Sequence, residues 1–315
     1  MVKFYRKKLK NGVVVLFEQR KGCGVVSVAF ATRYGGINEG VDEKGIAHFI
    51  EHLLYKGTSK RTAKQISEDI EKKGGVLNGF TSEQITSYWC KIPSKHLNTA
   101  LDVISDLVKN PIFDEKEMEK ERKVIFEEIK LYQDNPNLHI HDRIISTLYK
   151  GTLGMSLIGT PQTLNKMKRE DLIKKFQEVY GTENLILCVV GDTDFNKLCK
   201  FTEDNFEKTK AKLPKQKIIL QNKKVIEKRR GINQSNLVFA YHTPKVADKK
   251  HYAAQALNAL MAGGMSSRLF EEIREKRNLA YNVKGNCNSD KDFSYNAIYV
   301  GTKKENLALV KKIIL

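Results

Sequence analysis

The sequence lacks any long hydrophobic run. No stretch of its 315 residues approaches the roughly 18 to 20 consecutive apolar residues that a transmembrane helix needs. Its first segment, MVKFYRKKLKNGVVVLFEQR, contains neither the apolar block nor the cleavage site of a secretory signal peptide. We therefore expect a soluble, cytoplasmic protein with no membrane partner.

Cysteine pairs of the CxxC type are also missing. The five cysteines are odd in number and widely spaced: Cys23, Cys90, Cys188, Cys199 and Cys287. This usage is typical of buried, reduced thiols, and it favours them over a disulfide framework or a zinc site built from thiolates.

Acidic residues are too few to balance the basic ones, and the formal net charge is +18. Clustered Lys and Arg would supply a phosphate-binding surface for a nucleic acid. However, the lysines stand beside glutamates in helical segments such as KEMEKERK and EEIREKR, and no nucleic-acid motif accompanies them. The charge therefore indicates a solvated, lysine-rich surface and no nucleic-acid partner.

The length and a hydrophobic content of 41% favour two domains with cores of their own. Asn11-Gly12 predicts a hairpin near the start of the chain. Helices are expected over 43–56, 62–73, 94–109, 114–133, 138–149 and 169–180, and strands over 24–34, 76–81, 84–92 and 184–192.

The basic stretch KTKAKLPKQK is the best candidate for a linker, and the elements expected after it repeat the order of those at 24–109. They are a strand at 235–243, helices at 249–261 and 266–277, strands at 280–286 and 293–300, and a helix from about 303. We predict an α+β fold of duplicated α/β-roll-like domains, each a mostly antiparallel sheet packed with helices. The expected boundaries are 1–207, a linker at 208–223, and 224–315.

The second copy is expected to be incomplete. Its last helix corresponds to the helix expected at 94–109. About a hundred residues that the first copy uses to complete its layers therefore have no counterpart in the second copy. The chain is either naturally short, half of a split protein, or a fragment.

The segment HFIEH, residues 48–52, places three polar side chains on one side of a helix. At about 100° per residue, His48, Glu51 and His52 fall within an arc of about 100°, with apolar residues opposite. Two imidazoles one turn apart can reach one Zn²⁺, and an adjacent carboxylate can take a proton from water. A solvated polar face explains the same pattern, so these five residues leave both interpretations open.

A hydrolytic zinc site needs a third protein ligand, and the helix expected at 114–133 offers one. The residues one turn to either side of Glu128 are Val124, Ile125, Leu131 and Tyr132. This spacing predicts that Glu128 lies in the middle of an apolar stripe, where a carboxylate requires a partner such as a dication. Glu121, seven residues earlier, lies within about 20° of it around the helix. Both could instead be snorkelling or partly exposed glutamates.

Together these segments resemble the pitrilysin or insulinase family of metallopeptidases, in the two-domain branch similar to mitochondrial processing peptidase and its bacterial and archaeal relatives. HxxEH is the inverzincin motif, and in this family a glutamate in a segment like ERxVxxEEI follows it. Here Glu128 lies in ERKVIFEEI, 76 positions beyond His52. The resemblance implies one Zn²⁺ per chain held by His48, His52 and Glu128, with Glu51 as the general base and Glu121 as a supporting catalytic carboxylate.

The resemblance also implies residues that bind substrate. GGVLNGFTSEQITSYW is similar to the edge strand to which an extended peptide is added, which implies that Asn78 contacts substrate. AGGMSSRLFEEIREKRNLAY is similar to a second-domain segment whose arginine and tyrosine, seven apart, bind substrate and stabilise the oxyanion; Arg274 and Tyr281 have this spacing. From residue type alone, Arg274 would be a solvated helix residue and Tyr281 a core residue.

The resemblance therefore implies a zinc-dependent endopeptidase that hydrolyses peptides or unfolded segments in a cleft between two homologous domains, working as a homodimer or a paired subunit. Structural core proteins of respiratory complexes share this fold, so a non-catalytic assembly subunit is one alternative. A fragment that is active only with a partner is another. The presence of all the expected site residues favours the peptidase.

Overall fold

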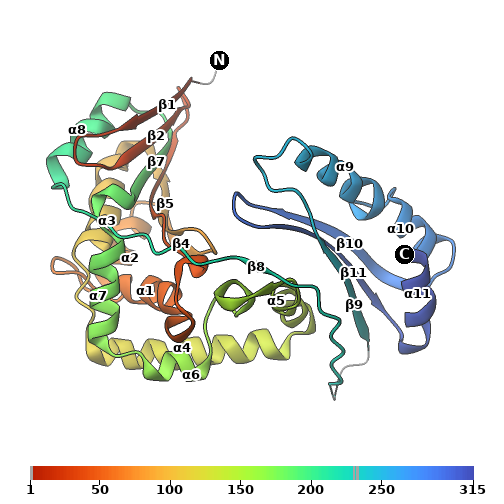
Figure 1. Cartoon of the computed structure of the whole chain (residues 1–315). Helices are drawn as coiled ribbons and strands as arrows, with labels where there is room; N and C mark the ends of the chain where they lie inside the picture. The colour runs from red at the N-terminus through yellow and green to blue at the C-terminus, as the bar shows by residue number, and fades with distance from the viewer. Residues whose placement is uncertain (1–2, 230, 232–233) are drawn as a thin grey trace. The chain divides into compact units, whose positions relative to one another are not determined.

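The computed structural model describes residues 3–229, 231 and 234–315, which form two compact units (Figure 1). The first unit contains the residues up to Ile129 together with Ser156–Gln216, and the second contains Lys130–Met155 together with Lys217–Leu315. Each unit combines helices with a mostly antiparallel sheet, which confirms the expected α+β class. The boundaries expected at 207 and 224 stay a prediction.

The first unit is built on a six-stranded sheet in the order β1-β2-β7-β3-β5-β4. Its strands are β1 (Lys3–Lys8), β2 (Val14–Gln19), β3 (Val25–Thr32), β4 (Val76–Thr81), β5 (Thr86–Pro93) and β7 (Leu185–Gly191). All neighbouring strands are antiparallel except β2 and β7. Because β4 is an edge strand, one side of its backbone has no partner within the sheet.

Local sequence explains two features of this sheet. Burial alternates residue by residue along β3, as its apolar and small residues predict for a strand with one packed face. The Asn11-Gly12 turn joins β1 to β2, and Gly12 takes a φ of 98°, which glycine adopts without steric cost. The expected hairpin is thereby confirmed.

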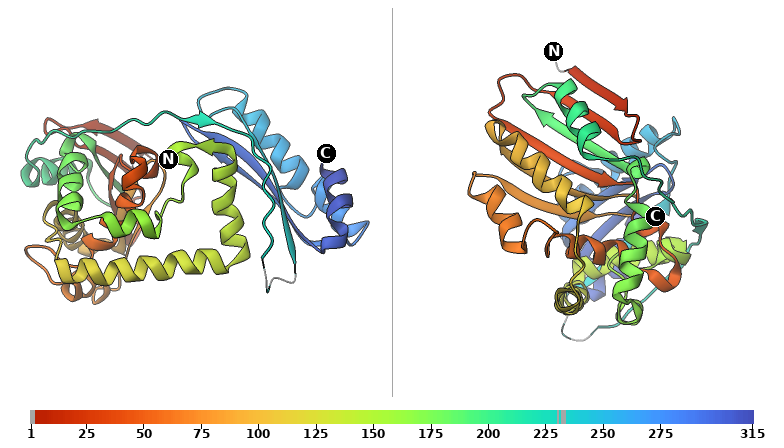
Figure 2. Two further views of the ribbon diagram at one scale, coloured as in Figure 1. Left: turned by 60° about the horizontal axis from the view of Figure 1, so that its bottom comes forward. Right: turned by 90° about the vertical axis from the view of Figure 1, so that its left-hand side faces the viewer.

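Seven helices belong wholly or largely to the first unit, in the part of the chain that the structure describes. They are α1 (Ile46–Leu54), α2 (Ala63–Glu71), α3 (Leu97–Lys109), α4 (Glu115–Asp134), α6 (Pro161–Lys166), α7 (Arg169–Val179) and α8 (Phe195–Asn205). The helix α3 packs on β3 and β5, along one face of the sheet (Figure 2, right). The sequence did not predict α6 or α8, and α1 begins at Ile46 because Gly45, with a φ of 96°, separates it from a short 3-10 turn.

The second unit contains a three-stranded antiparallel sheet in the order β10-β11-β9. Its strands are β9 (Ser235–His242), β10 (Ala280–Ser289) and β11 (Ser294–Thr302), and β6 (Tyr149–Lys150) pairs separately with β8 (Ile219–Leu220). Its helices are α5 (Pro136–Leu148), α9 (His251–Ala262), α10 (Arg268–Phe270) and α11 (Leu307–Ile314). Leu269, Ile273, Val283 and Val300 lie in its core.

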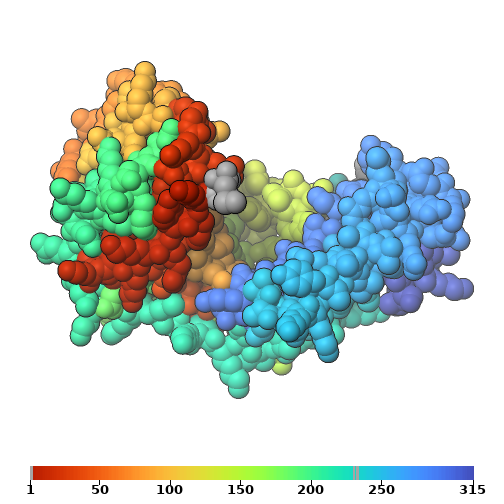
Figure 3. Space-filling model, turned by 90° about the horizontal axis from the view of Figure 1, so that it is seen from above, coloured from red at the N-terminus to blue at the C-terminus, as the bar shows by residue number. Residues whose placement is uncertain are grey.

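The two sheets share a topology. In chain order, β3, β4 and β5 form the arrangement β3-β5-β4, and β9, β10 and β11 form the matching arrangement β9-β11-β10. The helix α9 therefore corresponds to α1, and its surface, light blue in Figure 3, carries exposed apolar side chains such as Tyr252 and Leu260. The helix expected at 266–277 is interrupted, because only α10 is α-helical and Glu271–Glu275 forms a π-helical turn.

The long helix α4 ends where α5 begins (Figure 2, left). Asn135 caps α5 by accepting from the backbone of Asn137 and Leu138, and Pro136 takes the first helical position, where its missing N–H costs nothing. All five cysteines are free thiols. Among the described residues, no helix has both the length and the apolar character needed to cross a bilayer.

Candidate active site

The helix that carries HFIEH is anchored by a buried carboxylate. Glu39, which is fully buried, accepts hydrogen bonds from the backbone N–H groups of Gly45 (3.2 Å) and Ala47 (2.8 Å) at the start of α1. Lys44, also fully buried, lies with its Nζ 3.3 Å from the Glu39 carboxylate and donates to the Gly36 carbonyl at 2.8 Å. A negative charge at a helix N-terminus stabilises the helix, so this pair fixes the position of α1.

Three potential ligand atoms from α1 and α4 converge on one point. The Nε2 atoms of His48 and His52 are 3.3 Å apart, and an oxygen of Glu128 lies 3.5 Å from the first and 3.8 Å from the second. Among the described residues, this is the one group of three His, Cys, Asp or Glu side chains arranged to hold a metal ion. The structure therefore brings together the residues that sequence analysis placed at the metal.

The spacing of these atoms fits zinc. Tetrahedral bonds of about 2.1 Å place ligand atoms about 3.4 Å apart, close to the three distances in this group. Burial, reinforced by the neighbouring His52, lowers the pKa of His48 to about 3, which keeps its imidazole neutral as a metal ligand must be. Two imidazoles and one carboxylate are also a donor set found at catalytic zinc sites, where a fourth position stays open.

Glu51 lies beside this group on α1. Its carboxylate accepts a hydrogen bond from the Thr81 hydroxyl on β4 at 2.7 Å. Burial raises the pKa of Glu51, and the negative charge of Glu128 adds to the rise. The hydrogen bond from Thr81 and the electrostatic interaction with His52 oppose it. A carboxyl group with a raised pKa next to a metal site is suited to accepting and returning a proton.

Glu121 contacts the site from α4. One of its oxygens lies 3.0 Å from Nδ1 of His52, and the other lies 2.7 Å from Nζ of Lys56. Burial alone would raise the pKa of Glu121, but the hydrogen bonds from His52 and Lys56 outweigh it and lower the pKa below the usual value. Glu121 is therefore an anionic partner for the outer nitrogen of a candidate zinc ligand.

The environment of Glu128 differs from the one expected. Val124 and Leu131, which sequence analysis placed in an apolar stripe around Glu128, are 47% and 57% exposed. The buried side of α4 instead consists of Met118, Glu121, Arg122, Ile125 and Ile129. The prediction of a central position was wrong, because Glu128 lies at the edge of the buried side, where its carboxylate reaches the two histidines.

The edge strand β4 runs beside Glu51. A Cβ on Gly79 would come within 2.6 Å of the Tyr55 hydroxyl and 3.2 Å of a Glu51 oxygen, so only glycine leaves room for both side chains. Asn78, the expected substrate contact, is exposed on this strand, and its side-chain oxygen accepts from the backbone N–H of Gly79 at 2.8 Å.

Arg274 and Tyr281 lie together in the second unit. The Arg274 guanidinium is 4.8 Å from the centre of the Tyr281 ring and 4.7 Å from that of Phe270. Tyr281 is 79% exposed, so the interpretation of this residue as part of the core was wrong. Stacking between two rings holds the guanidinium, while the phenol remains accessible.

Sequence reasoning did not identify Glu39, Lys56, Gly79 or Thr81. The mid-strand position of Gly79 was a usable signal, because glycine there often marks a close approach of another group. Lys56 and Thr81 act through contacts with segments that are distant in sequence, which no local pattern marks. Glu39 contacts residues up to eight positions along the chain, through a turn that the sequence analysis did not predict.

Comparison with known proteins gives consistent matches along the whole chain. Residues 14–161 match the family described as Insulinase (Peptidase family M16), and residues 166–315 match Peptidase M16 inactive domain. An uncharacterized zinc protease of Rickettsia felis is 34% identical over 98% of this chain and 76% of its own length. The uncharacterized zinc protease YmxG of Bacillus subtilis is 32% identical over 100% of the chain and 77% of its length.

Solved structures agree with these matches. A protease from Helicobacter pylori superposes with a TM-score of 0.90 at 25% identity, over 100% of this chain and 79% of that one. The matched lengths mean that the chain spans about three quarters of each of these relatives.

The buried pair at the start of α1 gives a testable prediction. Glu39→Gln should lower the free energy of unfolding by about 3 kcal/mol, because it removes the nearer carboxylate and leaves the buried ammonium of Lys44 with only the Glu83 carboxylate, 3.8 Å away, as a charged partner. The double variant Glu39→Gln with Lys44→Met should recover part of that loss, since it removes both charges. Urea denaturation measures the free energy of unfolding of the unmodified protein, the single variant and the double variant.

Glu68→Gln is the matched control, because Glu68 pairs with Lys72 at 2.9 Å on the exposed side of α2. Its effect should stay within about 0.5 kcal/mol. A loss for Glu39→Gln as small as that of the control would contradict the anchoring role.

Proposed function

The chain belongs to the insulinase family of M16 peptidases, and from this premise we propose that it is a zinc-dependent endopeptidase acting on peptides or unfolded polypeptide segments. The observation that carries the proposal is the convergence of His48, His52 and Glu128 at distances suited to tetrahedral zinc. The relatives named as zinc proteases support the same class of activity.

We assign His48, His52 and Glu128 as the ligands of one Zn²⁺ per chain. Zinc bound there would supply an acidified water and a Lewis acid for a scissile carbonyl. The Nδ1–H of His52 donates to Glu121, which leaves the Nε2 lone pair of His52 facing the metal position. Glu121 thus supports the site without being a ligand.

Glu51 is the proposed general base. It would accept a proton from the attacking water and return it to the leaving amine, and its adjacency to His52 on α1 supports this role. The Thr81 hydroxyl holds one of its oxygens from the edge strand, which fixes the orientation of the carboxylate.

The free side of β4 supports a role in substrate binding. An extended peptide can add to an edge strand through main-chain hydrogen bonds, and Asn78 is exposed on that strand to contact it. Arg274 and Tyr281 are proposed to bind substrate carbonyls and stabilise the oxyanion, for which a guanidinium held between rings and an exposed phenol are suitable donors.

We further propose a cytoplasmic peptidase that works as a homodimer or a paired subunit, without nucleic-acid or membrane partners. The +18 charge includes lysines and arginines that pair with glutamates, as on α2 and in the segment 271–277. Sedimentation of the active protein as a stable monomer would contradict the pairing.

Replacement of the proposed base separates chemistry from metal binding. Glu51→Gln should bind zinc as the unmodified protein does and lose at least about 100-fold in turnover of a peptide library, because proton transfer by a positioned base contributes about 10² to 10⁴-fold. Glu71→Gln, on the exposed surface of α2, is the control and should leave turnover unchanged. Retained activity in Glu51→Gln would exclude Glu51 as the base.

Removal of a proposed ligand should remove the metal. His52→Ala should contain well below one zinc per chain by elemental analysis, because two remaining ligands hold zinc weakly. His96→Ala, in the same unit but outside the group of ligands, should keep its zinc. An unchanged zinc content in His52→Ala would show that His52 is not a ligand.

The non-catalytic alternative makes a different prediction for the same samples. A zinc-loaded, folded protein that cleaves no member of the library, with and without chelator, would favour an assembly subunit or a protein that needs a partner. Cleavage that stops on chelation supports the peptidase.

A further inference from the structure

The His52 ring has polar contacts at both of its nitrogen atoms. Its Nε2 faces His48 and Glu128, and its Nδ1 lies 3.0 Å from one oxygen of Glu121. An imidazole held at its outer nitrogen keeps both its tautomer and its ring orientation, so Glu121 determines how well His52 can serve a metal. The position of the Glu121 carboxylate is therefore a condition for the site.

Lys56 takes the other oxygen of that carboxylate. Its Nζ lies 2.7 Å from Oε1 of Glu121, while His52 occupies Oε2. A glutamate side chain has three rotatable bonds, and contacts to both oxygens are needed to fix its plane. The Glu121 side chain is only 7% exposed and that of Lys56 is 31% exposed, so this pair is much better shielded than an ordinary surface ion pair.

The backbone that carries Lys56 is fixed. Lys56 follows His52 by four residues, and its N–H donates to the Leu53 carbonyl at 3.0 Å, so it extends the same side of α1. The next residues form a turn in which the Thr58 hydroxyl donates to Asp106 at 2.6 Å and its N–H donates to the Arg61 carbonyl at 2.8 Å.

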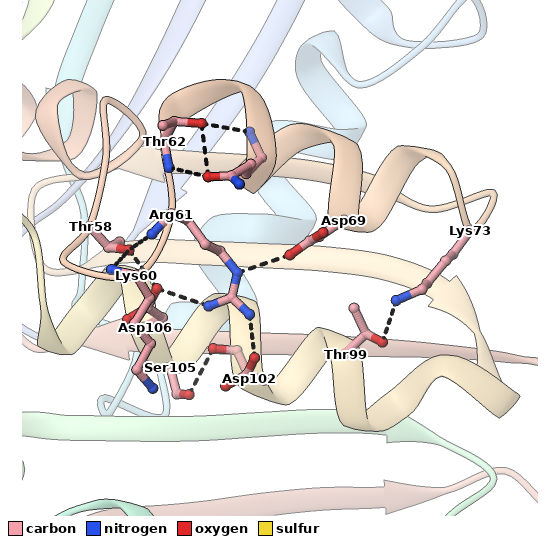
Figure 4. A network of polar contacts seen from close by, with 11 residues as sticks. Thr58, Lys60, Arg61, Thr62, Asp69, Lys73, Thr99, Asp102, Ser105 and Asp106 are labelled. Carbon is pink, nitrogen blue, oxygen red and sulfur yellow. Dashed lines mark hydrogen bonds and ion pairs between the residues drawn. The ribbon is translucent and has the colours of Figure 1, made fainter.

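Arg61 ties this turn to two helices, as Figure 4 shows. Its guanidinium donates to Asp69 on α2 at 2.9 Å and to Asp106 on α3 at 2.9 Å, and it also pairs with Asp102 on α3. The Asp106 side chain is 1% exposed, so the contact between Arg61 and Asp106 is shielded from water, while Asp69 and Asp102 are 42% and 52% exposed. The turn after Lys56 is thereby anchored, and the reach of the Lys56 side chain toward Glu121 is set by the fold.

We propose that Lys56 is a positioning residue of the zinc site, which holds Glu121 in the place where Glu121 orients His52. This inference rests on the proposed function, because it concerns a residue that acts on a zinc ligand. It assigns to Lys56 a role in metal affinity rather than in substrate chemistry.

The direction in which zinc affinity changes when Lys56 is removed distinguishes a positioning role of Lys56 from a purely electrostatic one. If Lys56 acted on the metal only through its charge, its removal would take a cation away from a dication and zinc binding would tighten. If Lys56 positions Glu121, its removal frees the carboxylate and zinc binding weakens. Residues that hold a metal ligand in this way typically contribute about 10 to 100-fold to metal affinity.

The test is a zinc titration of the whole chain against a chromophoric chelator. Lys56→Met should raise the Kd for zinc about 10-fold or more, and Lys56→Arg, which keeps a donor and the charge, should restore the Kd to within about 3-fold. Lys120→Met is the matched control, because Lys120 pairs with Glu117 on the exposed side of α4 at 2.6 Å, and it should leave the Kd unchanged.

A double-variant cycle tests the route through Glu121. Glu121→Gln should itself weaken zinc binding, and adding Lys56→Met to it should have little further effect, because the group that Lys56 holds has been changed. Lys56→Gln replaces Lys56→Met if thermal unfolding shows that the methionine variant is damaged. An unchanged or lower Kd in the neutral Lys56 variants, or full additivity with Glu121→Gln, would overturn the proposal.

The outcomes also separate this inference from the proposed function. If the unmodified chain binds no zinc, or if His52→Ala binds it equally well, the proposed zinc site is wrong. If the unmodified chain binds zinc through His52 and the neutral Lys56 variants bind it equally well, only the role of Lys56 is wrong.

Discussion

The structure depends on holding three electron-pair donors together. Two imidazole nitrogens and a carboxylate oxygen from α1 and α4 lie within 3.3 to 3.8 Å of one another, an arrangement that a divalent cation satisfies. Such a group requires that both helices be fixed in position. The buried Glu39–Lys44 pair anchors the start of α1, and Glu121 links α4 to the end of the same helix through His52 and Lys56. The polar contacts around the site thus hold α1 and α4 in position together.

Local periodicity predicted which candidate site residues share a side of a helix, and the resemblance to the metallopeptidase family supplied their expected roles. His48 and His52 are one turn apart, and Glu121 and Glu128 are two turns apart, so each pair had to share a side of its helix. Periodicity could not predict the environment of Glu128, because Val124 and Leu131 are apolar residues that remain 47% and 57% exposed. Burial depends on which segments reach a helix, and that is a property of the tertiary fold.

The difference between local sequence signals and tertiary contacts also explains which other predictions were correct and which contacts were missed. The order of strands and helices repeats along the chain, and the shared strand order of the two sheets follows from it. The Asn11-Gly12 turn was likewise a local signal. By contrast, the contact of Thr81 with Glu51 and that of Lys56 with Glu121 join segments 30 and 65 positions apart. Residue type alone would place Tyr281 in the core, because an aromatic ring usually packs inside, whereas here it stacks with Arg274 at the surface.

X-ray absorption at the zinc edge tests the central claim most directly, because it identifies the atoms bound to the metal without relying on activity. We expect one zinc per chain with a first shell of nitrogen and oxygen only, and with the outer-shell scattering of two imidazole rings. Sulfur in the first shell, or scattering from fewer than two imidazoles, would contradict the assignment of His48, His52 and Glu128.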